Sequence, residues 1–510
     1  ADGGALPRQA HPNKSTSETH KRLRSEVPDG PSSTRGQEPS TSVGGFCFAG
    51  ALRDGVVYSA QFNNSEFVEE NMQGERKTLT QLSVPICLET LFYMLSGMVD
   101  TLMLSSVSDQ AVGAVGTANT YIGVFIIMFG VISSGMVAVM SQNIGAGKPG
   151  IAYQARQLGL VFNALTGILM SFILAAFSGW ILKIVSIAPA LLEPAETYLK
   201  IVGGASFLNA LIPIFSSYLR VFGYTKHSLI GTVVGNVINI ILNSVFLFVF
   251  NWGVMGVAAA TVFSKVVNLI IVAAMGAVLI KAKQSPERAQ PRKILAQIVK
   301  IGFPSAFETA LYNVAMTFIV CFMNHMDTDG MNVTARSYAM QIANFSYCVG
   351  AALAQANAIM TGWRIGAKKY EECDRGTRKA VIYGLVTATC FSVTFAITGR
   401  FIVHIFTNDI QMIELVVKLL VVDIFLEFGR VTNLVYGQAL KTSGDAIFPV
   451  IIGAIFMYLF AVGGTYFLGI HMGLLAVGAY IAMAGDECAR AVGMVLRWKS
   501  GKWKSKSLVE

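Results

Sequence analysis

Charged residues are scarce in this chain of 510 residues: 14% are Asp, Glu, Lys or Arg, whereas 53% are hydrophobic. Soluble domains carry roughly 25% charged residues, so this composition argues against an ordinary soluble protein. The seven cysteines are scattered, without a CxxC pair or a Cys/His cluster at metal-ligand spacing. The chain also lacks a GxSxG, HExxH or P-loop motif. We therefore expect no enzyme, no cofactor, no catalytic or metal-binding residue, and no ATP-driven pump.

Long apolar runs are what the chain has instead. Stretches of about 20 residues recur from Leu82 to Val495, each long enough to cross a ~30 Å hydrocarbon layer. Lipid offers no partner to an open backbone, and runs without alternation exclude a β-barrel, so the spans must be helices. The pattern predicts an all-α polytopic membrane protein with twelve transmembrane helices. The predicted spans are 80–104, 113–140, 153–182, 195–219, 227–250, 254–280, 297–323, 333–361, 377–406, 412–439, 446–469 and 473–496.

Basic residues are concentrated in alternate connections between these spans. Lys281 to Lys293 and Arg364 to Lys379 are two such basic segments, whereas the intervening connections are short and poor in Lys and Arg. The positive-inside rule places the basic set in the cytoplasm together with both termini, which requires an even number of spans. The net charge of +9 is thus a topology signal, and no nucleic-acid partner is expected.

The chain repeats itself at a spacing near 220 residues. Residues 85–93 and 304–312 share Pro, Glu, Thr and Tyr in register, and residues 144–148 resemble residues 365–369. Each copy contains six predicted spans, so the second copy enters the membrane from the same side as the first. The sequence predicts two six-helix bundles related by a pseudo-two-fold axis along the membrane normal, an arrangement that suits alternating access.

These patterns divide the chain into five segments. Residues near the N-terminus are rich in Ser, Gly, Pro and charge, which is typical of disorder. The predicted segments are a disordered N-terminal extension (1–71), an N-lobe (72–280), a cytoplasmic linker (281–296), a C-lobe (297–496) and a basic cytoplasmic tail (497–510). We expect the natural protein to begin at Met72. We expect the tail to anchor at the membrane surface.

Five segments together resemble the multidrug and toxic compound extrusion (MATE) family over residues 72–498. They are Val99–Thr101, Ser141–Gly147, Arg220–Gly223, Asn239–Asn243 and Gly256–Thr261. The resemblance implies a twelve-helix antiporter that expels small organic, often cationic compounds in exchange for sodium ions or protons. It also favours a bacterial inner membrane as the location. We expect a monomer whose other partner is the lipid bilayer.

Four polar residues of the first half form the candidate coupling-cation site. Asp100 lies in an otherwise apolar span, where an ionised carboxylate costs about 2.5–3.5 kcal/mol near the bilayer centre. Asn239 and Asn243 share a helix face, and Thr261 lies in the next span. Ile319 occupies the position of Asp100 in the repeat, so packing alone does not require an acid there.

The resemblance places a coupling-cation site among these residues, with transient sodium possible at Asp100. Asn243 stands where many relatives carry a second Asp, which leaves sodium and proton coupling both open. The alternatives are a protonated Asp100 held by hydrogen bonds within the bundle and ordinary interhelical hydrogen bonds for the asparagines.

A second set of residues is expected to line the pathway or to gate it. Glu427 and Arg430 are three apart and can pair on one helix face, either as a structural or gating ion pair or as a direct binding site. Glu89 and Glu308 are repeat equivalents near predicted helix starts, where they could favour the helix dipole or line the pathway. Tyr93 and Tyr312 could offer aromatic surface to organic cations.

The nearest competing interpretation is a lipid-linked oligosaccharide flippase of the same superfamily. Such a protein should place basic residues in its cavity to hold phosphate, whereas the predicted spans here contain mainly acids and amides, with Arg430 as the exception. A channel is disfavoured because no re-entrant filter motif occurs.

Overall fold

The described part of the chain is helical. The computed structural model describes residues 77–106, 108–184, 189–282, 285–326 and 330–509, which belong to one compact unit, Phe62–Glu510. Within these residues there are helices and no strands, so the predicted all-α class is confirmed. The predicted disordered extension, 1–71, lies outside the described residues.

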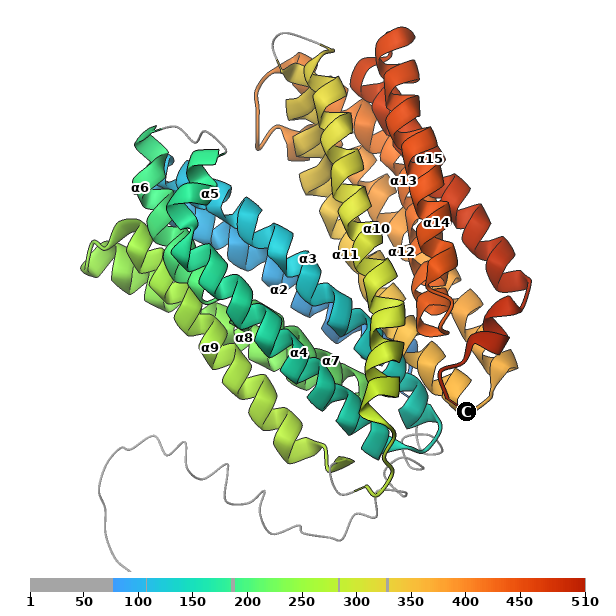
Figure 1. The fold of residues 1–510 in the computed structure, drawn as a ribbon. Coiled ribbons are helices and arrows are strands. Elements are labelled where there is room, and N and C mark those ends of the chain that lie inside the picture. The colour runs from blue at the N-terminus through green and yellow to red at the C-terminus, as the bar shows by residue number, and fades with distance from the viewer. Residues whose placement is uncertain (1–76, 107, 185–188, 283–284, 327–329, 510) are drawn as a thin grey trace, which may run out of the picture. The chain divides into compact units, whose positions relative to one another are not determined.

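The first half of the chain contains the helices up to α9 (Figure 1, blue to green). They are α2 (Leu79–Ser105), α3 (Asp109–Gly145), α4 (Pro149–Ala176), α5 (Ser178–Ile184), α6 (Pro189–Tyr198), η1 (Leu199–Gly203), α7 (Phe207–Val221), α8 (Thr225–Ser244), η2 (Val245–Val249) and α9 (Gly253–Leu279).

The second half contains the helices from α10 onward (Figure 1, yellow to red). They are α10 (Pro291–Asn324), α11 (Met331–Gly366), α12 (Tyr370–Val403), α13 (Ile410–Thr442), α14 (Ile447–Phe456), η4 (Met457–Val462), η5 (Thr465–His471), α15 (Leu475–Lys499) and η6 (Lys502–Lys506). Helix α10 begins inside the predicted linker because Pro291 is favourable at the first helical position.

Seven of the described helices are long and apolar enough to cross a membrane, and up to nine spans result if each of two bent pairs counts as one. One bent pair lies within α3, and the other joins α6 and η1 to α7. The long helices α11, α13 and α15 carry more polar side chains and are not among the seven. A helix packed among other helices can carry polar groups that a lipid-facing helix cannot, because protein partners replace the missing water.

The internal repeat extends to the backbone. The turn after α7 contains Gly223 and the turn after α13 contains Gly444, at φ +82° and +98°, a region that glycine enters without steric cost. The turn after α3 has Gly147 at φ +73°, and its repeat equivalent after α11 is Lys368 at φ +58°. Equivalent positions thus end equivalent helices with the same left-handed geometry.

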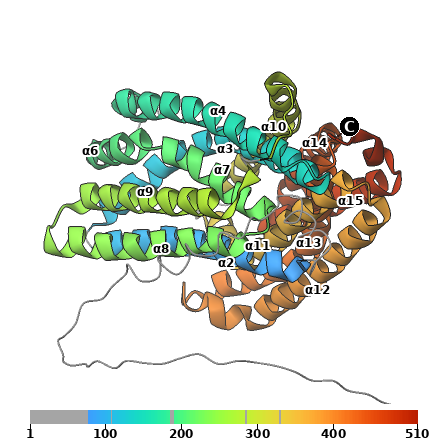
Figure 2. The same cartoon turned by 90° about the horizontal axis from the view of Figure 1, so that it is seen from below.

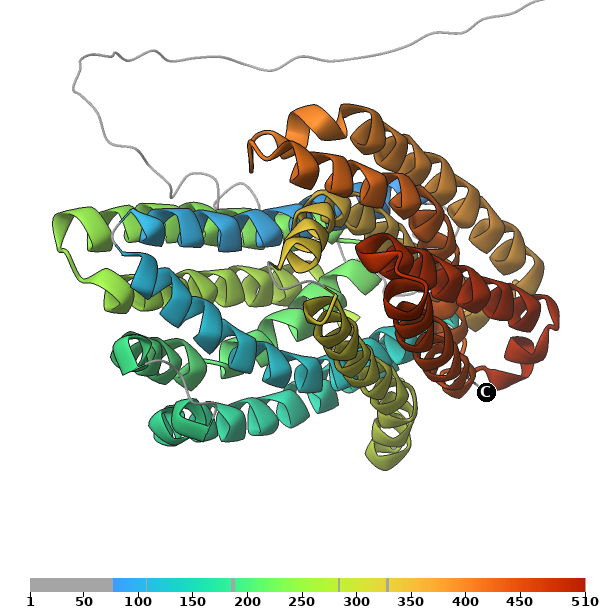
Figure 3. The same cartoon turned by 90° about the horizontal axis from the view of Figure 1, so that it is seen from above.

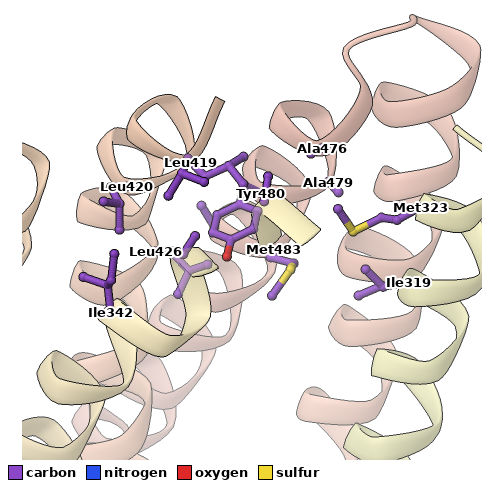
Figure 4. Packing of buried hydrophobic residues seen from close by; sticks show 14 of the residues in the cluster. Ile319, Met323, Ile342, Leu419, Leu420, Leu426, Ala476, Ala479, Tyr480 and Met483 are labelled. Atoms are coloured by element: carbon purple, nitrogen blue, oxygen red, sulfur yellow. The ribbon is translucent and has the colours of Figure 1, made fainter. Parts of the chain in front are cut away.

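Each half has its own apolar core at one end of the helices. In the second half the core surrounds Tyr480 and includes Ile319, Leu419 and Met483 (Figure 4). In the first half the corresponding cluster includes Leu104 and residues from the beginnings of α3 and α9. Both clusters draw only on their own half among the described residues.

At the other end of the helices the two halves pack against each other. Ile294 and Ile298 of α10 belong to the same cluster as Ile132 and Met136 of α3, and Leu82 of α2 clusters with residues of α11. The end views show α13 beside α12 and α15, and α8 beside α9, within their respective halves (Figures 2 and 3). The halves therefore meet where α3, α7 and α11 end and where α10 begins.

Glycines allow the closest of these approaches. A Cβ added at Gly302 of α10 would lie 1.7 Å from the carbonyl oxygen of Val131 in α3, and one at Gly135 would lie 2.0 Å from that of Ile298. Helices α3 and α10 thus cross with their backbones in contact, which only a residue without a side chain permits.

We expect Gly302→Ala to lower the stability of the purified protein by about 3 kcal/mol, the upper range for overpacking, because the obstructing atom is backbone and cannot rotate away. Gly130→Ala on α3 is the matched control, since a Cβ there meets nothing within 4 Å. Thermal unfolding in detergent measures both variants. Equal midpoints for the two would show that the contact between α3 and α10 is not as close as described.

The tryptophans of the C-terminal tail are packed inside the protein, whereas the sequence predicted that they anchor the tail at the membrane surface. Trp498 and Trp503 are buried, and their rings stack with centroids 4.2 Å apart. The lysines of this segment, such as Lys502 and Lys504, are exposed. The sequence pattern of mixed Lys and Trp suggested a membrane interface, but the tryptophans pack on the protein because α12 and α13 provide an aromatic surface around Tyr436.

Candidate functional site

The polar residues predicted in the first half lie together. Asn243 of α8 donates from Nδ2 to Asp100 Oδ1 of α2 at 2.5 Å, and the same nitrogen lies 3.4 Å from Asn239 Oδ1. Both asparagines are buried and Asp100 is half-buried. The i, i+4 spacing on α8 places both amides on the face that packs against α2. The structure thus brings together three of the four predicted residues by direct hydrogen bonds.

Thr261 completes this cluster from α9. Its hydroxyl donates to Val257 O of its own helix at 2.8 Å, and the side chain is buried. Tyr198 of α6, also buried, interacts with both Thr261 and Asp100. The cluster therefore gathers side chains from four helices of the first half.

Lys265 is a charged neighbour of this cluster that our sequence reasoning missed. It follows Thr261 by four residues on α9, so the two share a helix face, and its charge acts on Asp100. Lys265 lies inside the predicted span 254–280. The rule that singled out Asp100, that a charge within a span needs a function or a partner, applies equally to this lysine.

The two halves hold equivalent ion pairs. Glu89 Oε1 of α2 lies 2.7 Å from Arg220 Nη2 of α7, and Glu308 Oε2 of α10 lies 2.5 Å from Lys441 Nζ of α13. The repeat aligns Glu89 with Glu308 and Arg220 with Lys441. Neither glutamate is in the first turn of its helix, so the predicted helix-dipole role is wrong for both. Each is instead the acidic partner of a cation contributed by a later helix of its own half.

Glu89 also belongs to a wider network that reaches the other half. Ser228 Oγ donates to Glu89 Oε1 at 3.0 Å, and Arg220 Nη1 donates to Gln355 Oε1 of α11 at 3.0 Å. Trp363 of α11 adds a second bond, from its Nε1 to Val221 O at 3.0 Å. The end of α7 is therefore hydrogen-bonded to α11 through both a side chain and the backbone.

A buried charge network occupies the second half. Arg430 Nη1 donates to Glu427 Oε1 at 2.5 Å, so the predicted pair on α13 forms, and Glu427 is fully buried. Glu487 of α15 lies 3.8 Å from Arg430 Nε and 2.9 Å from Arg490 Nη2. Arg490 also lies 2.5 Å from Asp486. Alternating acids and arginines thus join α13 to α15.

Three members of this network were missed from the sequence. Asp486, Glu487 and Arg490 lie in the predicted span 473–496, where the rule on charges within spans would also have found them. Their pairing could not be predicted, because nothing in the local sequence says that α15 packs on α13. The two tyrosines predicted to line the pathway are exposed in the described structure, Tyr312 by 37% and Tyr93 by 65%.

The fold and these clusters define an all-helical, multi-pass membrane protein with ionisable groups buried between its helices. The MatE family model matches the chain twice, over residues 85–245 and 304–467. The chain therefore belongs to the MATE family of transporters, as the sequence segments indicated. The two matched ranges agree with the internal repeat.

Relatives and solved structures agree with this assignment. The chain is 31% identical to the uncharacterized transporter YisQ of Bacillus subtilis over 84% of this chain and 96% of the relative. It is 25% identical to the probable multidrug resistance protein NorM of Thermotoga maritima, over 86% and 96%. A crystal structure of MATE in the bent conformation superposes with a TM-score of 0.78 at 18% identity, covering 87% of this chain and 98% of that one.

Proposed function

We propose that this protein is a secondary-active multidrug efflux antiporter that exports small organic, often cationic compounds in exchange for protons. Relatives named as multidrug resistance proteins support the substrate class. The choice of the proton as the coupling ion rests on the cluster of Asp100, Asn243 and Lys265 in the first half. No resident cofactor takes part in this proposal, and the protein acts as a monomer.

The chemistry of this cluster favours a proton over sodium. A sodium site needs several oxygen ligands and a negative charge to balance the ion. Here an N–H of Asn243 already occupies Oδ1 of the single carboxylate, and the positive charge of Lys265 acts on Asp100. A proton requires only the carboxylate of Asp100. Exchange then proceeds as Asp100 takes up a proton from one side and releases it to the other.

Two six-helix bundles related by a pseudo-two-fold axis along the membrane normal provide the alternating access in this proposal. One range that the family model matches lies within the proposed N-lobe, 72–280, and the other lies within the proposed C-lobe, 297–496, which supports this division. The basic connections put both termini in the cytoplasm of a bacterial cell, so the end where the halves pack together is the cytoplasmic end. In this proposal the described conformation is closed toward the cytoplasm.

Export can be tested in cells. We expect expression of the protein in a drug-hypersensitive bacterial strain to lower steady-state ethidium fluorescence severalfold, and addition of a protonophore to abolish the difference. Cells carrying the empty vector are the control. Equal ethidium levels in the two strains, with the protein shown in the membrane, would contradict export of organic cations.

A further inference from the structure

The segment after α15 crosses from the second half to the first. Leu508 donates from its backbone N to Gln142 Oε1 of α3 at 2.8 Å, and Ser507 Oγ donates to the same oxygen at 3.2 Å. Gln142 is fully buried, and its Nε2 donates to Thr442 O of α13 at 2.6 Å. The side-chain amide of Gln142 therefore makes hydrogen bonds through both its nitrogen and its oxygen: the nitrogen bonds to α13 and the oxygen bonds to the tail.

The tail is held firmly at its other end. Trp503 is 1% exposed, stacks on Trp498 and donates from Nε1 to Trp498 O at 2.9 Å. Trp498 in turn donates to Asp374 of α12 at 2.8 Å. Buried aromatic rings contribute most of the energy of such packing, so the tail is fixed to the second half by this stack.

The turn after α13 has a glycine, Gly444, at the point where the backbone of the tail passes over it. A Cβ at Gly444 would lie 2.2 Å from Lys506 O, so the tail backbone lies directly on the glycine. Beyond this point Leu508 packs beside Ala138 of α3, Ile301 of α10 and Ala446. The tail therefore passes over the turn of the second half, and Leu508 packs against helices on both sides of the junction.

We propose that residues 500–509 form a latch that holds the two halves together at their packed end, and that Gln142 must leave this segment before the halves can separate there. The inference rests on the alternating access of the proposed function. A tail that belongs to one half and bonds to the other stabilises the conformation in which they touch and contributes nothing once they part. The latch thus lowers the population of the conformation open at this end.

A reducible cross-link tests whether release is required. In Gln142→Cys/Ser507→Cys protein, a short bis-methanethiosulfonate reagent joins the tail to α3, and the two variants with only one of these substitutions, treated alike, are the controls. We expect ethidium efflux to fall to background after cross-linking and to return after reduction, while both controls keep their rates. Unchanged efflux by fully cross-linked protein would overturn the latch.

A native thiol provides a test that needs no transport. Cys348 of α11 is fully buried and its Sγ lies 3.6 Å from Cys87 O of α2, so it faces the junction between the halves. We expect Leu508→Asp, which places a carboxylate among apolar side chains, to raise the rate of Cys348 alkylation by N-ethylmaleimide about fivefold, roughly the population change that one ordinary hydrogen bond carries.

The controls for this test lie in the same chain. Lys502→Ala changes an exposed residue of the same tail and should leave the Cys348 rate unaltered, and the exposed thiols of Cys321 and Cys390 should react equally in every variant. An unchanged Cys348 rate in Leu508→Asp protein would overturn the latch. If alkylation rises but no variant exports ethidium, the latch stands and the proposed function fails.

Discussion

Asp100→Asn should reduce gradient-driven ethidium efflux to the level of vesicles without protein, a loss of at least about tenfold. The carboxylate is the single acid of the first-half cluster, and an amide in its place cannot take up and release a proton. The neutral, nearly isosteric side chain keeps a hydrogen-bonding partner for Asn243, so folding should be preserved. Efflux from proteoliposomes and the thermal unfolding midpoint are measured together.

Glu414→Gln is the matched control for this variant. It makes the same acid-to-amide change at an exposed position of α13 and should leave efflux unaltered. Full efflux by Asp100→Asn protein under a proton gradient would show that this carboxylate does not carry the coupling proton.

Arg430→Met should destabilise the purified protein by about 3 kcal/mol or more. The substitution leaves Glu427 fully buried without its cation, and removing one partner of a buried ion pair typically costs about 3–5 kcal/mol. We expect a lower unfolding midpoint in detergent, and a reduced yield of monodisperse protein.

The double variant Glu427→Gln/Arg430→Met distinguishes loss of the pair from loss of packing. With the buried carboxylate removed as well, we expect much of the lost stability to return, because a neutral pair has no uncompensated charge. If the double variant is as unstable as the sum of the single changes, the two side chains do not stabilise each other through their charges.

The sequence was most informative where a physical rule acts locally or where the chain repeats. Apolar length predicted the helical class, and the i, i+4 spacing of Asn239 and Asn243 predicted one face. The repeat aligned Glu89 with Glu308 and Arg220 with Lys441, so both ion pairs could have been predicted once either one was suspected.

Contacts between distant segments could not be predicted in the same way. The bonds of Gln142 to Thr442 and to Leu508 join residues about 300 or more positions apart, and no local pattern specifies them. Lys265 and Glu487 were missed for a different reason. Each lies in a span that was recognised by its apolar residues, although the charges inside it are the informative feature: Lys265 in one span, and Asp486, Glu487 and Arg490 in the other.

The measurement that tests the central claim most directly is ethidium efflux from proteoliposomes holding the purified wild-type protein, with a proton gradient and a sodium gradient imposed separately. We predict efflux driven by the proton gradient alone, because Asn243 donates to Oδ1 of the single carboxylate and the positive charge of Lys265 acts on Asp100. Efflux driven only by sodium would contradict the proton-coupled site. No efflux under either gradient, with the protein shown to be folded, would contradict multidrug export itself and move the lipid-linked oligosaccharide flippase to first place.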